Sequence, residues 1–135
     1  MFHGDAAPPD RELDSYTLTL STMGQRALGI EAAQLIAVAR WMQQRSPGAP
    51  VRLDTTGKRN QVTALIAAAL EPELFSEVIV HDGMYSLKYL LDAPVRFHDA
   101  PELFCLDLFK DFDIDRLALL VGNTKVTQHY LTITR

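Results

Sequence analysis

The stretch from Val51 to Leu70 constrains the fold most, because an extended segment, a glycine and an apolar helix follow one another there. Residues 51–55 have the pattern of a strand, Gly57 interrupts it, and a helical pattern starts within a few residues. One face of this helix carries Val62, Leu65, Ile66, Ala69 and Leu70. Such a βα corner of an open parallel sheet is where ligands and nucleophiles gather, although it also serves as plain scaffold.

The remaining segments alternate between strand-like and helix-like patterns. We expect strands at 15–20, 51–55, 77–80 and 125–133, with helices at 28–44, 61–70, 86–91, 101–109 and 114–121. The apolar stripe of helix 28–44 is expected to comprise Ile30, Ala33, Ala37 and Trp41, widened by Leu35, Ile36 and Val38. Asp113 is expected to cap the N-terminus of the last helix. The alternation predicts an α/β fold with a mostly parallel sheet flanked by helices.

Length and composition set the outer limits. The 135 residues are expected to form one domain at 15–135, preceded by a flexible polar arm at 1–14. A formal net charge of −4 with scattered Lys and Arg argues against nucleic-acid binding. No apolar run approaches the ~20 residues that cross a bilayer. Because the N-terminus also lacks the features of a signal peptide, we expect no membrane association and a cytoplasmic location.

The single cysteine, Cys105, excludes an internal disulfide and a multi-cysteine metal site. Its apolar surroundings, LFCLDLF, favour a buried small hydrophobe over a nucleophile. A calcium loop that starts at Asp111, Asp113 and Asp115 breaks at Arg116 and Gly122. No histidine spacing matches a compact metal motif. We therefore expect neither a metal nor a cofactor.

Several segments together carry a family resemblance. They are ALGIEAAQLIAVARWM, VRLDTTG, QVTALIAAALEP, SEVIVHDG and FDIDRLALLVGNTKVT, in that order. The run 28–127 resembles the middle of an α/β-hydrolase, and more narrowly the acetylxylan-esterase and dienelactone-hydrolase-like enzymes of bacteria. The resemblance implies a partial α/β-hydrolase-like sheet and an esterase that acts on small or carbohydrate-linked acyl groups. Relatives of this kind include secreted enzymes.

The chain departs from that family at the catalytic positions. The nucleophile elbow of such enzymes is G-x-S-x-G. The aligned residues are Gly57, Lys58, Arg59, Asn60 and Gln61. Arg59 takes the place of the serine, and it cannot be usefully acylated because it stays protonated. The family's acid and histidine follow later strands, but 128–135 contains no carboxylate side chain and no further strand. A conventional triad therefore cannot be assembled at the family positions.

An improvised site is the remaining catalytic hypothesis. His81 and Asp82 follow the strand 77–80, and Ser86 lies close behind them, so the three residues could form a base, an orienter and a nucleophile. Neighbouring residues on a turn usually point apart, which argues against this trio. His98 with Asp99 offers the same chemistry on equally weak grounds, and a surface role is the default for His129. Thr56 and Cys105 are further nucleophile candidates.

Three functions stay open. The first is an esterase-like hydrolase with a nonstandard site, acting on a small ester. The second is a noncatalytic oligomeric interaction module derived from a hydrolase. The third is an anion or small-ligand binder at the Gly57 corner, where Lys58 and Arg59 begin a helix. Solvated surface charge is the simpler interpretation of these two residues. The sequence around them does not match the phosphate-loop motif. The resemblance also implies strands that the chain lacks, so uncovered edges and apolar helix faces predict a homo-oligomer.

Overall fold

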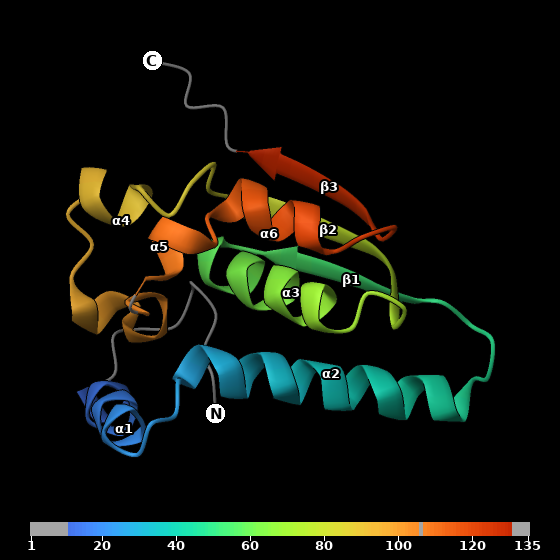
Figure 1. Cartoon of the computed structure of the whole chain (residues 1–135), viewed down its shortest axis with the longest axis horizontal. Helices are drawn as coiled ribbons and strands as arrows, with labels where there is room; N and C mark the ends of the chain where they lie inside the picture. The colour runs from blue at the N-terminus through green and yellow to red at the C-terminus, as the bar shows by residue number, and fades with distance from the viewer. Residues whose placement is uncertain (1–10, 106, 131–135) are drawn as a thin grey trace.

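The computed structural model of the chain describes residues 11–105 and 107–130. Its centre is a three-stranded sheet in the order β1-β2-β3, with both strand pairs parallel (Figure 1). The strands are β1 (Val51–Thr56), β2 (Phe75–Gly83) and β3 (Lys125–Tyr130). The predicted α/β class with a parallel sheet is therefore confirmed.

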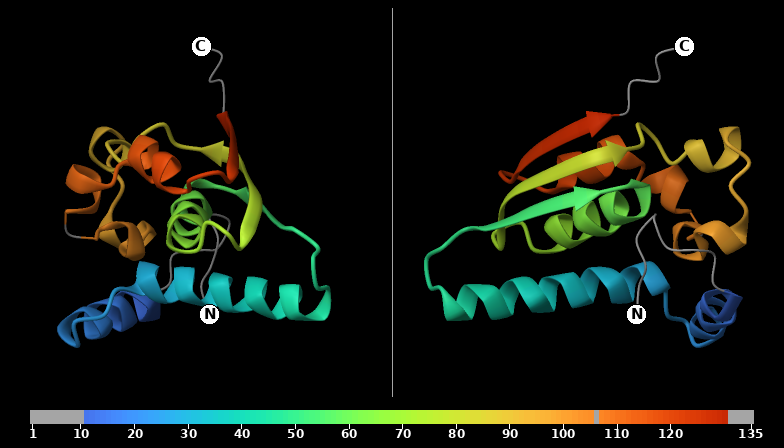
Figure 2. Two further views of the ribbon diagram at one scale, coloured as in Figure 1. Left: turned by 45° about the vertical axis from the view of Figure 1, so that its right-hand side comes forward. Right: turned by 180° about the vertical axis from the view of Figure 1, so that it is seen from behind.

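The helices lie on one side of this sheet and beyond the carboxyl ends of its strands (Figures 1 and 2). They are α1 (Arg11–Thr22), α2 (Ala27–Arg45), α3 (Lys58–Leu70), α4 (Tyr89–Asp92), α5 (Leu108–Asp111) and α6 (Ile114–Leu120), with the 3-10 turns η1 (Phe97–Asp99) and η2 (Pro101–Leu103). Figures 1 and 2 show α3 and α6 against one face of the sheet, with α2 along the outer side of α3. Within the described ranges, no helix covers the opposite face.

That opposite face is polar, as its cross-strand rows show. Glu77 pairs in register with Arg52 on one side and with Lys125 on the other. The Lys125 ammonium lies 2.7 Å from the Glu77 carboxylate, and the Glu77 side chain remains partly exposed. A parallel sheet is usually covered on both faces by apolar layers. The charged side chains on this face can contact water instead. Each strand therefore alternates between apolar residues that face the helices and polar residues that face away from them.

The βα corner at Gly57 forms as the sequence predicts. Gly57 has φ 93° and ψ 160°, a conformation that side chains bearing a Cβ rarely adopt. Its amide donates to the carbonyl of His81 at 2.9 Å, which joins the end of β1 to β2. Helix α3 begins directly afterwards at Lys58, ahead of the expected Gln61. The glycine therefore lets the chain leave the sheet and enter α3 without a longer loop.

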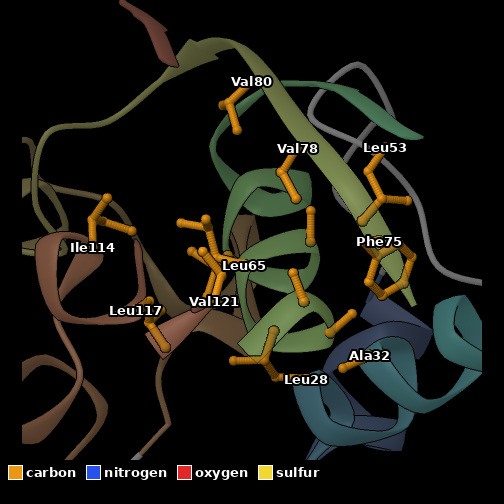
Figure 3. Packing of buried hydrophobic residues seen from close by; sticks show 14 of the residues in the cluster. Leu28, Ala32, Leu53, Leu65, Phe75, Val78, Val80, Ile114, Leu117 and Val121 are labelled. Atoms are coloured by element: carbon orange, nitrogen blue, oxygen red, sulfur yellow. The ribbon is translucent and has the colours of Figure 1, made fainter. Parts of the chain in front are cut away.

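The core lies between α3 and the sheet (Figure 3). Val62 and Leu65 of α3 are fully buried, as are Val78 and Val80 of β2. The predicted α3 face is confirmed at these two positions, but Leu70 at its end is 64% exposed. Ile114 and Leu117 of α6, and Val121 directly after it, join the same core as predicted. Asp113 accepts a hydrogen bond from the amide of Ile114 at 2.7 Å, which confirms the expected cap.

The predicted strand at 15–20 is wrong, because these residues lie within α1. Threonine-rich alternation favours a strand, but here the hydroxyls bond to the carbonyls of the preceding turn. Thr19 Oγ1 donates to the Ser15 carbonyl at 2.8 Å, and Ser21 Oγ donates to the Thr17 carbonyl at 2.9 Å. The last part of the predicted arm, 11–14, is likewise helical. Residues 1–10 of that arm lie outside the described residues.

The predicted helix at 101–109 is also wrong. The chain forms η2, then a turn in which Asp107 has φ 62°, and then the short helix α5. Pro101 and Leu103 pack into the core from η2, so burial rather than helix periodicity places the apolar residues here.

The expected turn at 81–83 is part of the strand β2. Helix 86–91 is shifted to α4, and the predicted extension of β3 to residue 133 lies partly outside the described residues.

Helix α2 occurs where expected, but its buried side overlaps the predicted stripe only at Ile36 and, in part, at Leu35. Leu28, Ala32, Ile36 and Ala39 face the core. The residues of the predicted stripe that are exposed are Ala33, Ala37, Val38 and Trp41. Apolar residues lie on both sides of this helix, so periodicity alone could not select the side that packs against α3.

A buried glutamine joins α3 to both later strands. The Gln61 side chain is fully buried, and its Nε2 donates to the Met84 carbonyl at 3.0 Å and to Gln128 Oε1 at 2.7 Å. The Met84 amide donates back to Gln61 Oε1 at 2.8 Å. A Cβ at Gly83 would lie 2.9 Å from Gln61 Cδ, so the glycine makes room for this amide.

Replacing Gln61 with Ala should lower the free energy of unfolding by about 3 kcal/mol, because it leaves the buried amide and carbonyl of Met84 without partners. Urea denaturation followed by circular dichroism measures this loss. Gln34→Ala, at an exposed position of α2, serves as the matched control and should change stability by less than ~0.5 kcal/mol. Equal stability of the Gln61 variant and the wild type would contradict a stabilising network.

Candidate functional site

Two cavities meet at the carboxyl end of the sheet, next to the start of α3. Their volumes are about 400 Å³ and about 420 Å³, and both are lined by Lys58 and Tyr89. The first lies between α3 and the segment 89–103, and the second lies between β2, α4 and the end of β3. Binding sites of open parallel sheets form at this edge, because the strands end there and helices begin. The two cavities together are called the corner groove below.

Tyrosines and lysines line the second cavity of the corner groove. Tyr85 and Tyr130 stack with ring centroids 3.7 Å apart. The Lys58 ammonium lies 5.0 Å from the centre of the Tyr89 ring, within the range of a cation–π contact. Burial, and then the nearby phenol of Tyr85, raise the pKa of Tyr130 above its ordinary value. This wall therefore offers flat aromatic surface together with positive charge.

The elbow residues make structural contacts rather than exposing a nucleophile. The guanidinium of Arg59 binds both carboxylate oxygens of Glu102, with Nη2 3.0 Å from Oε2 and Nε closer still. The two side chains are only 11% and 2% exposed. Asn60 donates from its side chain to the Thr56 carbonyl at 2.9 Å, which closes the turn. Arg59 thus forms a buried ion pair between α3 and η2.

A second carboxylate lies close to this ion pair. Glu31 of α2 accepts a hydrogen bond from Thr63 Oγ1 at 3.0 Å. Burial, and then the charge of Glu102, raise its pKa from 4.5 to about 7, while the Thr63 hydrogen bond and Arg59 oppose the rise. Two carboxylates therefore lie near one guanidinium where α2, α3 and η2 meet, and only Glu102 binds it directly. Sequence reasoning missed this cluster, since its members lie on three separate elements.

The structure gives the members of the predicted trio different partners. Ser86 Oγ donates to Asp113 Oδ2 at 2.6 Å and accepts from the Lys88 amide at 3.0 Å. His81 Nε2 lies 3.1 Å from Asp54 Oδ1 on the polar face of the sheet. Asp82, next to His81, has φ 56°. Ser86 is thus held by the cap of α6, whereas His81 is paired with β1.

The other histidines and nucleophile candidates also have defined surroundings. The rings of His81 and His129 stack with centroids 5.1 Å apart, on neighbouring strands. Asp99 pairs with Arg96 at 3.4 Å, and Arg96 lowers the pKa of Asp99 below its ordinary value. The ring of His98 makes an edge contact with Phe97. Cys105 is partly buried and packs against the hydrophobic core, in line with the reading of a small hydrophobe.

Two further searches cover the described ranges only. Within 11–105 and 107–130, no group of three or more His, Cys, Asp or Glu side chains is arranged to hold a metal ion. In the same ranges, no helix combines the length and the apolar character needed to span a bilayer.

Replacing Glu31 with Gln should remove a pH dependence of stability. The folded state raises the pKa of Glu31, so its stabilisation is full below about pH 4.5 and is lost as pH rises from there through about 7. The loss should amount to roughly 2 kcal/mol after allowance for solvent screening at this partly exposed site. Urea midpoints at pH 5 and pH 8 should therefore differ less in the variant. The exposed Glu73→Gln variant should keep the wild-type difference, and an unchanged difference in Glu31→Gln would refute the assignment.

No family model, curated protein or solved structure matches this chain. The contacts and cavities of the structure therefore carry the argument for function.

Proposed function

We propose that this chain is a noncatalytic binding module, derived from a hydrolase, that takes a small ligand in the corner groove. The proposal rests on the residue that the chain has at the elbow, where an arginine stands in place of a serine. Arg59, in the position of the nucleophile, is fixed to the buried carboxylate of Glu102, while open volume remains on either side of Lys58 and Tyr89. The corner thus keeps the shape of a ligand site and loses the group that would react.

The contacts of Ser86, one of the nucleophile candidates, support this proposal. The Ser86 hydroxyl is engaged as a donor to Asp113 and as an acceptor from the Lys88 amide. A nucleophilic serine needs a neighbouring base that takes its proton, and the residue that binds Ser86, Asp113, is engaged as the cap of α6. The same Asp113 receives the amides of Leu87 and Ile114, both at 2.7 Å. This arrangement holds the groove wall in place.

The lining of the groove favours a ligand with an apolar or aromatic body and a negative charge. Tyr85, Tyr89 and Tyr130 provide faces on which a planar ring can stack. Lys58 and Lys88 stand at the same cavity and supply positive charge, although Lys88 also pairs with Asp92 at 3.4 Å. A volume of about 420 Å³ suits a small organic molecule.

Benzoate should raise the melting temperature of the protein in a concentration-dependent way, because a ligand that binds only the folded state stabilises it by mass action. Benzyl alcohol, which lacks the charge, and acetate, which lacks the ring, should give smaller shifts at equal concentration. Differential scanning fluorimetry makes this comparison. Calorimetric titration should then give a dissociation constant for benzoate that Lys58→Met weakens about tenfold, the loss of one charge contact.

Lys110→Met provides the matched control, since Lys110 is exposed on α5 and lines neither cavity of the groove. It should bind benzoate as the wild type does, and Tyr89→Leu should bind it more weakly. An equal response to all three probes, or equal affinity in Lys58→Met and Lys110→Met, would count against the corner groove as the site.

A second candidate function is ester hydrolysis, and one contact favours it. His81 Nε2 lies 3.1 Å from Asp54 Oδ1 near the carboxyl ends of β1 and β2. A carboxylate that orients an imidazole is one half of a hydrolytic triad, and such a histidine can activate water directly. In this alternative, His81 acts as the general base and Asp54 positions it, so no serine nucleophile is needed.

The two candidates differ in their response to p-nitrophenyl acetate and p-nitrophenyl butyrate. The binding proposal expects hydrolysis no faster than in buffer, measured by release of p-nitrophenolate. Turnover above buffer that is lost in His81→Ala and retained in Ser86→Ala would favour the second candidate. Turnover that is lost in both variants would instead restore the trio of His81, Asp82 and Ser86.

A further inference from the structure

The outer side of α2 is an apolar surface that no described element covers. Val38, Trp41 and Met42 are 54%, 55% and 50% exposed, and Ala37 and Ala33, one and two turns before Trp41, are also exposed. These five residues are called the α2 stripe below. They lie opposite the stripe of Leu28, Ala32, Ile36 and Ala39 that packs into the core. Figures 1 and 2 show α2 along the outside of the molecule, with its outer side clear of the other helices.

We propose that the α2 stripe binds the same stripe of a second copy of the chain, so that two α2 helices pack antiparallel across a two-fold axis at Ala37. Contiguous apolar surface on a helix that already has one buried side marks an interaction site. An isologous contact requires a surface that is complementary to itself. The α2 stripe meets this requirement in shape and in charge.

Shape complementarity follows from the order of the residues. With Ala37 on the axis, Trp41 of each copy lies opposite Ala33 of the other. The large indole thus meets a small side chain, and two such contacts flank the centre. Small residues at the middle of the stripe allow the helices to approach closely, which packing of side-chain ridges requires.

Charge selects the antiparallel arrangement over the parallel one. Of the two arginines of α2, Arg40 pairs with Glu71 at 2.6 Å. Arg45 instead lies over the Trp41 ring at 5.0 Å, at the end of the stripe, where it can remain in contact with water. A parallel pair would place the two Arg45 side chains next to each other, and like charges in contact are destabilising, whereas the antiparallel pair places them at opposite ends.

The size of the surface sets the expected strength. Helix α2 has 19 residues and is therefore about 28 Å long. One helix pair of that length buries less than the ~1,200 Å² at the lower end of standard interfaces. The dimer should accordingly be in concentration-dependent exchange with the monomer, with a dissociation constant in the micromolar range.

Trp41 provides a direct readout, since it is the single tryptophan of the chain. Dilution from high to submicromolar concentration should lower the mass from two chains to one by sedimentation velocity. Over the same range, the Trp41 emission should shift to longer wavelength as the indole becomes exposed. Val38→Glu should give the one-chain mass and the long-wavelength emission at every concentration.

Leu119→Glu serves as the matched control, because Leu119 is an 81% exposed apolar residue of α6. It should dimerise as the wild type does. A second measurement does not depend on the folding of Val38→Glu. With Cys105→Ser as background, Ala37→Cys should form a disulfide-linked dimer under a mild oxidant, since the two copies of residue 37 meet at the axis, whereas Leu119→Cys should not.

Three outcomes would overturn the proposal. The first is a one-chain mass at all concentrations, which would leave the stripe to a different partner. The second is a dimer that Val38→Glu retains with unchanged Trp41 emission, because it would use another surface. The third is equal cross-linking of Ala37→Cys and Leu119→Cys.

Discussion

The direction of the chain through the sheet determines the rest of the architecture. Strand order β1-β2-β3 means that both crossovers step the same way. Crossovers between parallel strands are right-handed almost without exception, so two steps in one direction place both connecting helices on one face. Helices α3 and α6 therefore share a side, and the other face has no helix within the described ranges (Figure 2). The polar rows there, such as Glu77 with Lys125, are what such a face needs in water.

The same constraint concentrates polar contacts at the carboxyl end of the strands. The end of β1 turns at Gly57, and the end of β2 leads to Met84, whose amide and carbonyl are bound by Gln61. The corner groove lies between these two exits. Arg59 lines the first cavity of the groove, and it is held there by its ion pair with the buried Glu102. Such a pair fixes the positions of α3 and η2 relative to each other, because breaking it would leave a buried charge without a partner.

Local signals in the sequence predicted the parts of the fold that have one plausible reading. The strand β1, the corner at Gly57, α3 and the cap at Asp113 each follow from turn chemistry or periodicity. Signals that admit two interpretations failed: α1 resembles a strand in its threonines, and α2 is apolar on two sides.

The contacts of the site could not be predicted from the sequence for a different reason. Arg59 and Glu102 are 43 residues apart, and only tertiary packing sets that pairing. The contact of His81 with Asp54 was easier to predict from the sequence, because alternation along β1 and β2 places both residues on the polar face once the two strands are aligned.

The carboxylate of Asp113 ties the two ends of an irregular segment together. It receives Ser86 across a separation of 27 residues and holds the first amide of α6 as well. Closing a loop of this length costs about 3 kcal/mol of chain entropy, and one charged group with several bonds offsets it. The segment between the two points therefore behaves as a closed loop fastened at its neck. Within this loop, Leu103 and Glu102 are held a second time, by the core and by Arg59, so only its exposed positions can vary while the sheet and α6 stay in place.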